Sequence, residues 1–187
     1  MKVLNVPNAL TILRALLIPV IIVGAYSNSA TMLIVTIFLV MFAWIIDYFD
    51  GYIARKYNLI TNFGIFFDPV IDKILMLSLF FVFADLELIP LWMPLVILFR
   101  EFFTTGIREF ASIKGKVIGA NWMGKAKWNL QMIIAIYTLS FLLARSLDYV
   151  PFHGKEIIYF GTFAMVLISL IFAFIFFWWN RNYFLEY

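Results

Sequence analysis

Four aspartates lie close together in the chain, flanked on both sides by long apolar runs. Asp47 and Asp50 are three residues apart, and Asp68 and Asp72 are four residues apart. At these spacings the two members of each pair lie on one face of a helix. Carboxylates that converge repel one another unless a counter-charge is present. The simplest counter-charge is one or two divalent cations with oxygen ligands, either Mg²⁺ or Mn²⁺.

The aspartates belong to a longer pattern, D-x2-D-G-x2-A-R-x8-G-x3-D-x3-D, which begins at Asp47 and ends at Asp72. This pattern resembles the signature of the CDP-alcohol phosphotransferase family. The resemblance implies a metal site formed by Asp47, Asp50, Asp68 and Asp72, with Asp72 also serving as the general base. The alternative is that these carboxylates are interhelical salt-bridge partners or a cation-transport path.

Small residues follow the first aspartate pair within the same pattern. Gly51 and Ala54 have almost no side chain, so a nucleotide can approach the helix backbone closely there. Small residues also favour tight packing of membrane helices, and both explanations can hold together. Arg55 ends this helix, where it either pairs with a phosphate or marks the cytoplasmic boundary. We therefore expect Gly51, Ala54 and Arg55 to contact a CDP-lipid.

The composition indicates a membrane protein. Of the 187 residues, 65% are hydrophobic, whereas soluble domains are about 45–50% apolar. The sequence therefore predicts an all-α integral membrane protein, with residues 1–187 forming a single domain. A membrane-spanning helix needs about 20 apolar residues. We expect a short amphipathic N-terminal segment and six transmembrane helices, at about 10–26, 31–54, 63–84, 91–110, 128–143 and 157–179.

The basic residues are distributed unevenly between the two ends of the predicted helices. If the N-terminus is inside, only Arg145 and Lys155 fall on the outer side. Lys and Arg mark the cytoplasmic side, so the aspartates are expected to open to the cytoplasm. The net charge of +3 suits loops that face anionic membrane lipids, not nucleic acid. The expected location is the bacterial inner membrane.

A polar edge runs along the start of the first predicted helix. Asn8, Thr11 and Arg14 recur every three residues on an otherwise apolar helix. One interpretation is an interfacial helix start with a snorkelling arginine. The other is that this edge faces the headgroup of the CDP-lipid. The segment resembles the amino-terminal Pro-Asn-x-x-Thr-x-x-Arg of the same family, which favours the second interpretation.

The fourth predicted helix carries a basic face. Arg100, Thr104 and Arg108 are spaced i, i+4 and i+8, so two guanidinium groups flank a hydroxyl on one side. Arginine forks fit phosphate oxygens, and Lys125, with Lys127 beside it in the next loop, could complete a phosphate pocket. The alternative is structural pairing with Glu101 and Glu109. A phosphate pocket beside an alcohol-activating site predicts a phosphorylated alcohol as acceptor.

These acceptor residues resemble the branch of the family that uses glycerol 3-phosphate. The resemblance implies transfer of the phosphatidyl group of CDP-diacylglycerol to glycerol 3-phosphate, giving phosphatidylglycerol phosphate and CMP. It also implies a homodimeric enzyme that works within membrane lipids. Alternative acceptors are inositol phosphate, serine or a second phospholipid. A cation transporter is disfavoured, because residues 74–84 contain only Ser78 as a polar residue and offer no path across the bilayer.

Overall fold

The computed structural model describes residues 5–57, 59, 61–113, 115, 122–149 and 152–181. The side chains of Tyr48, Arg55, Asn62, Trp122, Met123 and Lys125 lie outside this description. The described residues form helices and no strand, and each of the predicted spans corresponds to one helix. The helices are α1 (Val6–Ala25), α2 (Ala30–Lys56), α3 (Asn62–Asp85), α4 (Trp92–Ile113), α5 (Trp122–Ser146) and α6 (Gly154–Asn180).

Within the described residues, four helices are long and apolar enough to cross a membrane: α1, α2, α5 and α6. The other two carry their charges in mid-helix, Asp68 to Lys73 in α3 and Arg100 to Glu109 in α4. Composition alone therefore does not mark α3 and α4 as spans, although their 24 and 22 residues exceed the roughly 20 that a membrane-spanning helix needs. The chain is an all-helical, multi-pass membrane protein, as predicted.

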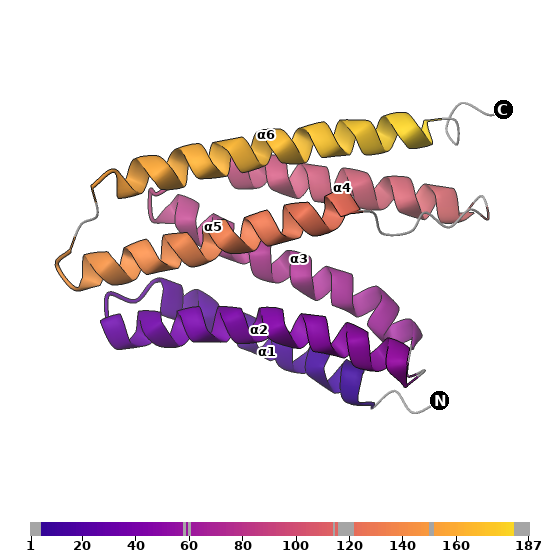
Figure 1. Ribbon diagram of the computed structural model, residues 1–187, viewed down its shortest axis with the longest axis horizontal. Helices are drawn as coiled ribbons and strands as arrows, with labels where there is room; N and C mark the ends of the chain where they lie inside the picture. The colour runs from indigo at the N-terminus through magenta and orange to yellow at the C-terminus, as the bar shows by residue number, and fades with distance from the viewer. Residues whose placement is uncertain are drawn as a thin grey trace.

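Consecutive helices run in opposite directions, and both ends of the chain lie at the same end of the molecule (Figure 1). Helix α1 packs against α2 and α3, while α5 packs against α2 and α6, and α4 packs against α6. In Figure 1, α3 and α5 lie between the α1–α2 pair and the α4–α6 pair. This arrangement leaves Arg100 and Glu101 of α4 buried and Asp72 and Lys73 of α3 half-buried.

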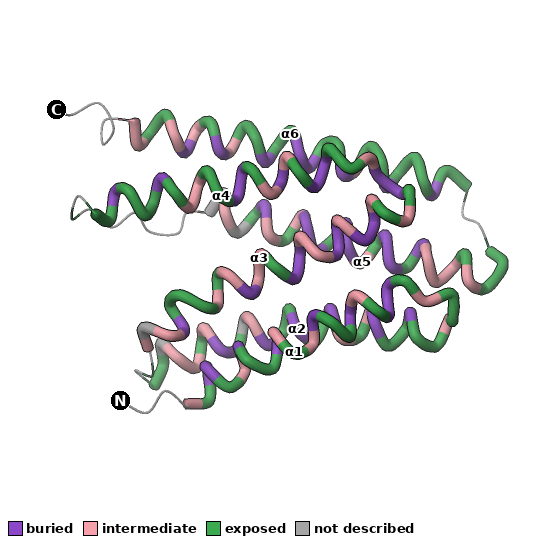
Figure 2. Tube along the Cα trace, turned by 180° about the vertical axis from the view of Figure 1, so that it is seen from behind, coloured by how far each residue is buried: buried purple, intermediate pink, exposed green. Residues whose placement is uncertain are grey.

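The interior is apolar away from these charges, and the outer surface is apolar too. Leu79, Phe80 and Phe83 of α3 are fully buried, together with Ile21 and Leu139 from the neighbouring helices. Large exposed side chains cover the outward faces of the helices, which Figure 2 colours green. In water such a surface would be costly to expose, whereas lipid tails accept it at no hydrophobic penalty.

Helix ends near the aspartates are fixed by local caps. The Asn5 side chain accepts a hydrogen bond from the Asn8 backbone N–H at 3.0 Å, and Pro7 occupies the first turn of α1. The Thr61 hydroxyl accepts from the Gly64 backbone N–H at 3.1 Å and so begins α3. The expected amphipathic N-terminal segment is not a separate element among the described residues, because α1 is continuous from Val6.

The tightest approach between α1 and α2 predicts a stability effect. A Cβ at Gly24 would lie 2.0 Å from the Thr36 hydroxyl, which is buried and donates to the Met32 carbonyl at 2.8 Å. We expect Gly24→Ala to lower the free energy of unfolding by about 1–3 kcal/mol through overpacking. The matched control is Gly161→Ala on α6, where nothing lies within 4 Å of the added Cβ. Thermal unfolding in detergent measures both, and equal midpoints would contradict the tight packing.

Candidate active site

The four aspartates converge around one arginine. Arg14 of α1 places Nη1 against Asp47 at 2.7 Å and against Asp72. Its Nη2 lies 2.7 Å from Asp50 and 3.7 Å from Asp68. The two carboxylate pairs, one from α2 and one from α3, therefore share a single guanidinium. Part of the counter-charge that the sequence predicted as metal ions is supplied by the protein itself.

The polar edge of α1 lies behind the aspartates. Thr11 donates a hydrogen bond to Asp68, and the Asn8 amide oxygen accepts one from the Thr61 hydroxyl at 2.8 Å. Asn8, Thr11 and Arg14 are all buried. A Cβ at Gly64 would lie only 3.2 Å from the Asn8 amide oxygen, so a glycine suits this position. This edge was expected to face the CDP-lipid, but here it supports the aspartates from the opposite side.

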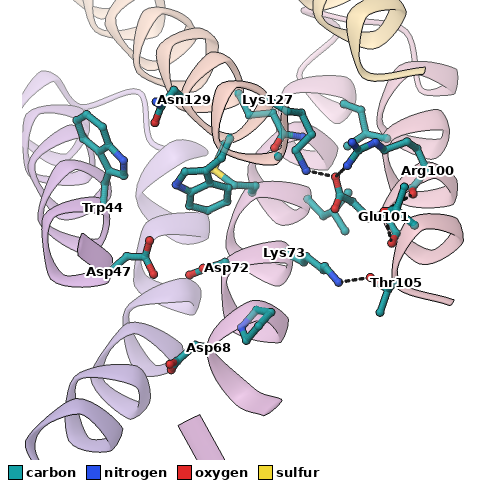
Figure 3. A pocket seen from close by; sticks show the side chains of 18 of the residues that line it. Trp44, Asp47, Asp68, Asp72, Lys73, Arg100, Glu101, Thr105, Lys127 and Asn129 are labelled. Atoms are coloured by element: carbon teal, nitrogen blue, oxygen red, sulfur yellow. Dashed lines mark hydrogen bonds and ion pairs between the residues drawn. The ribbon is translucent and has the colours of Figure 1, made fainter. Parts of the chain in front are cut away.

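A cavity of about 1210 Å³ opens in front of the aspartates. One wall is formed by the α2 and α3 aspartates together with Gly51 and Pro69. The opposite wall comes from α4 and α5 together with Lys73 of α3, and it is lined by basic and hydroxyl side chains. Figure 3 shows Asp47, Asp68 and Asp72 on one side, with Lys73, Arg100 and Lys127 across from them. Two motifs far apart in sequence thus face one another across one space.

The basic wall contains a buried ion cluster. Glu101 accepts from Arg100 Nη1 at 3.0 Å and from Lys127 Nζ of α5. Arg100 also donates through Nε to the Ser169 carbonyl of α6 at 3.3 Å. The structural alternative for Arg100, pairing with Glu101, is therefore present in the fold. This cluster ties α4 to both α5 and α6.

Two cations of this wall have no carboxylate partner among the described residues. Lys73 donates to the Thr105 hydroxyl, and the Arg108 guanidinium lies over the Phe176 ring, 5.4 Å from its centroid. Both line the cavity. Unlike Arg100 and Lys127, neither forms an ion pair with a described carboxylate, so both are available to a ligand.

Several predicted site residues can be placed only in part. Thr104 lines the cavity, and its hydroxyl donates to carbonyls of its own helix at Arg100 and Glu101. Ala54 is on α2 but is not among the residues lining the cavity. The side chains of Arg55 and Lys125 lie outside the described residues, so their predicted contacts stay predictions.

Lys73 is a cavity residue that the sequence analysis did not name as a site residue, whereas Lys127 was named with Lys125 as a residue that could complete the phosphate pocket. The position of Lys73 directly after Asp72 was an available signal. The predicted helix began at residue 128, whereas α5 begins at Trp122, so Lys127 lies on this helix and not in a loop.

The two walls carry opposite charge. Four carboxylates against Arg14 leave an excess of three negative charges. On the other wall, Lys73, Arg100, Arg108 and Lys127 against Glu101 leave an excess of three positive charges. Formal charges of this size in a partly buried space favour ligands of complementary charge. The cavity therefore suits cations on one side and a phosphate on the other.

The acidic wall has the chemistry of a divalent-cation site. Carboxylate oxygens are the hard donors that Mg²⁺ and Mn²⁺ prefer, and three negative charges remain after Arg14 is counted. Among the described residues, no three acidic or histidine side chains are already grouped as ligands of one ion. Arg14 bridges the carboxylates instead. By donor type and charge, Asp47, Asp50, Asp68 and Asp72 are the residues that would hold a cation.

The fold and the site define a multi-pass membrane protein that brings a carboxylate cluster and a phosphate-type basic wall to one cavity. The chain belongs to the CDP-alcohol phosphatidyltransferase family, whose model matches residues 4–180. This confirms the resemblance seen in the aspartate pattern. Members of this family generally use divalent metal ions, in keeping with the donor set of the acidic wall.

Curated bacterial relatives match most of the chain. A Rickettsia felis protein is 36% identical over 167 residues, which covers 87% of this chain and 90% of the relative. A Rickettsia bellii protein is 38% identical over 170 residues, with 87% and 90% covered. A Bacillus subtilis protein is 38% identical over 142 residues, with 69% and 73% covered. Each of these is named CDP-diacylglycerol–glycerol-3-phosphate 3-phosphatidyltransferase.

The ion cluster on the basic wall predicts a large stability effect. Glu101→Gln would leave Arg100 and Lys127 buried without their carboxylate, and breaking a buried ion pair on one side costs about 3–5 kcal/mol. Glu109→Gln is the matched control, because Glu109 is exposed on the same helix. We expect a clear drop in thermal midpoint for Glu101→Gln and a change within about 0.5 kcal/mol for Glu109→Gln. Similar midpoints for the two variants would show that the cluster does not stabilise the fold.

Proposed function

We propose that this chain transfers the phosphatidyl group of CDP-diacylglycerol to glycerol 3-phosphate, producing phosphatidylglycerol phosphate and CMP. The observation that carries this proposal is that an acidic wall and a basic wall face the same cavity. A pyrophosphate with its cations suits the acidic wall, and the phosphate of a small acceptor suits the basic wall. The names of the relatives point to the same pair of substrates.

The reaction requires one bond to form and one to break. The free primary hydroxyl of glycerol 3-phosphate attacks the phosphorus attached to the diacylglycerol, and the bond from that phosphorus to the CMP oxygen breaks. The hydroxyl proton passes to the enzyme, and CMP leaves with the bonding electron pair. In our proposal two divalent cations, either Mg²⁺ or Mn²⁺, would supply the positive charge that neutralises the pyrophosphate.

Asp72 is our candidate for the general base. It lines the cavity and keeps 22% of its side chain exposed, which is less than Asp47 at 28% and Asp68 at 33% but more than Asp50 at 3%. In Figure 3 it lies between Asp47 and Lys73, where the acidic wall meets the basic one. A hydroxyl held by the basic wall would therefore be presented to Asp72. In this proposal Asp47, Asp50 and Asp68 bind the cations together with Asp72, which also serves as the base.

Arg108 and Lys73 are our primary candidates for the acceptor phosphate. Among the described residues neither is neutralised by a carboxylate, and both line the cavity. Arg100 and Lys127 share Glu101, so they contribute one net positive charge behind this pair. Thr104 and Lys125 remain proposed contacts from the sequence. The CDP-lipid is proposed to approach α2 at Gly51, which lines the acidic wall.

We further propose that the enzyme is a homodimer in the bacterial inner membrane with the site open to the cytoplasm. The uneven distribution of Lys and Arg supports this orientation. Both termini lie at one end of the molecule (Figure 1), as an even number of crossings requires. The bacterial origin of the relatives supports the location.

The first prediction of this proposal concerns the acceptor. Detergent-purified protein with CDP-diacylglycerol and Mg²⁺ is expected to release CMP when glycerol 3-phosphate is the only acceptor, and not with serine or inositol phosphate. Arg108→Ala should lower kcat/KM for glycerol 3-phosphate roughly 10- to 100-fold, because a hydrogen bond to a charged group contributes about 1.5–3 kcal/mol.

The control for this variant is Arg181→Ala, an arginine at the end of α6 that lies over Trp178, 4.1 Å from the ring centroid. It removes the same charge away from the cavity and should leave kcat/KM near the parent value. If CMP were released only with a different acceptor, the proposed role of the acidic wall would stand, but glycerol 3-phosphate would be rejected as the acceptor. Equal losses in both arginine variants would reject Arg108 as a phosphate contact.

The second prediction concerns the base. Asp72→Asn keeps the size of the side chain but removes its ability to accept a proton. We expect kcat to fall by about 10²–10⁴-fold, the usual contribution of general base catalysis. Binding of CDP-diacylglycerol, measured by equilibrium titration, should change much less. A variant that turns over at the parent rate would show that another group removes the proton.

A further inference from the structure

Arg14 contacts every aspartate of the acidic wall, and it does so in an ordered way. Nη1 contacts Asp47 of α2 and Asp72 of α3, while Nη2 contacts Asp50 of α2 and Asp68 of α3. Each terminal nitrogen thus bridges one carboxylate from each helix. The planar guanidinium can do this because its donors form a fixed fork, which a lysine ammonium lacks.

The same residue is shielded from the cavity. Its side chain is 1% exposed, and no residue of α1 is among those lining the cavity. Its Nε is buried without a hydrogen-bond partner among the described residues, so the polar contacts seen for the group are made by its terminal nitrogens. Arg14 therefore reaches the aspartates from behind and does not touch a ligand in the cavity.

We infer that Arg14 is the built-in counter-charge of the acidic wall: a positioning residue that holds α1, α2 and α3 together before any divalent cation binds. With it the aspartates carry an excess of three negative charges, and without it the excess would rise by one. The added repulsion would separate the carboxylates whenever cations are absent. Bound divalent cations would then neutralise the carboxylates in place of Arg14 and so keep the helices that carry them together.

This inference predicts how stability depends on divalent cations, and the test needs no substrate. Thermal unfolding of the detergent-purified chain is followed in EDTA and in millimolar MgCl₂. Arg14→Gln is expected to lower the midpoint in EDTA by about 10 °C, as the loss of one partner of a buried ion pair does in a chain of this size. MgCl₂ should raise the midpoint of Arg14→Gln at least twice as much as that of the parent, because a ligand stabilises the state that binds it.

Two further variants separate charge from shape. Arg145→Gln is the matched control, since Arg145 is exposed in the last turn of α5, and it should follow the parent in both buffers. Arg14→Lys keeps the charge but cannot bridge both carboxylate pairs, so its midpoint in EDTA should lie between those of the parent and Arg14→Gln.

The double variant Arg14→Gln/Asp50→Asn removes one positive and one negative buried charge together. It should be more stable in EDTA than Arg14→Gln alone, and it should still yield folded protein if the single variant does not. A double variant that is no more stable than the single one would overturn the counter-charge role in favour of packing. The counter-charge role would also be overturned if Arg14→Gln and Arg145→Gln had the same thermal midpoint in EDTA. Neither outcome depends on the identity of the acceptor, so the proposed function is tested separately.

Discussion

The structure depends on placing four carboxylates inside a bundle that lies in lipid. On insertion scales a charge at the bilayer centre costs about 2.5–3.5 kcal/mol, and like charges that converge add repulsion. The fold meets this cost with one guanidinium from α1, which contacts carboxylates of both α2 and α3. Because one side chain must reach two helices, the positions of α1, α2 and α3 along one another are restricted. The close approach of Gly24 to Thr36 allows α1 and α2 to pack at that distance.

The basic wall follows the same rule with the signs reversed. Glu101 is placed between Arg100 and Lys127, so one buried carboxylate lowers the cost of two buried cations. In both walls the internal partner neutralises only part of the charge. What remains is three negative charges on one wall and three positive charges on the other. A fully neutralised cavity would be easier to bury but would have little to offer a cation or a phosphate.

The sequence predicted the helices well because each span is a separate apolar run, bounded by polar residues. It also predicted that the members of each aspartate pair share a face, because helical spacing determines this locally. It could not predict what the α1 edge faces. Periodicity places Asn8, Thr11 and Arg14 on one side of a helix, but their partners are set by packing against residues more than thirty positions away. The pairing of Glu101 with Lys127 depends likewise on the contact between α4 and α5.

The basic face of α4 is divided along its length, which periodicity alone does not reveal. Arg100 and Arg108 are separated by two helical turns, roughly 12 Å along the axis. Arg100 is buried and is held by Glu101 and the Ser169 carbonyl, whereas Arg108 is exposed over Phe176. Since α4 runs towards the end of the molecule that carries both termini (Figure 1), Arg108 is the nearer of the two to that end. A phosphate entering from there would meet the Arg108 guanidinium first, which forms no ion pair with a described carboxylate. Arg100, paired with Glu101, keeps the deeper part of the wall in place.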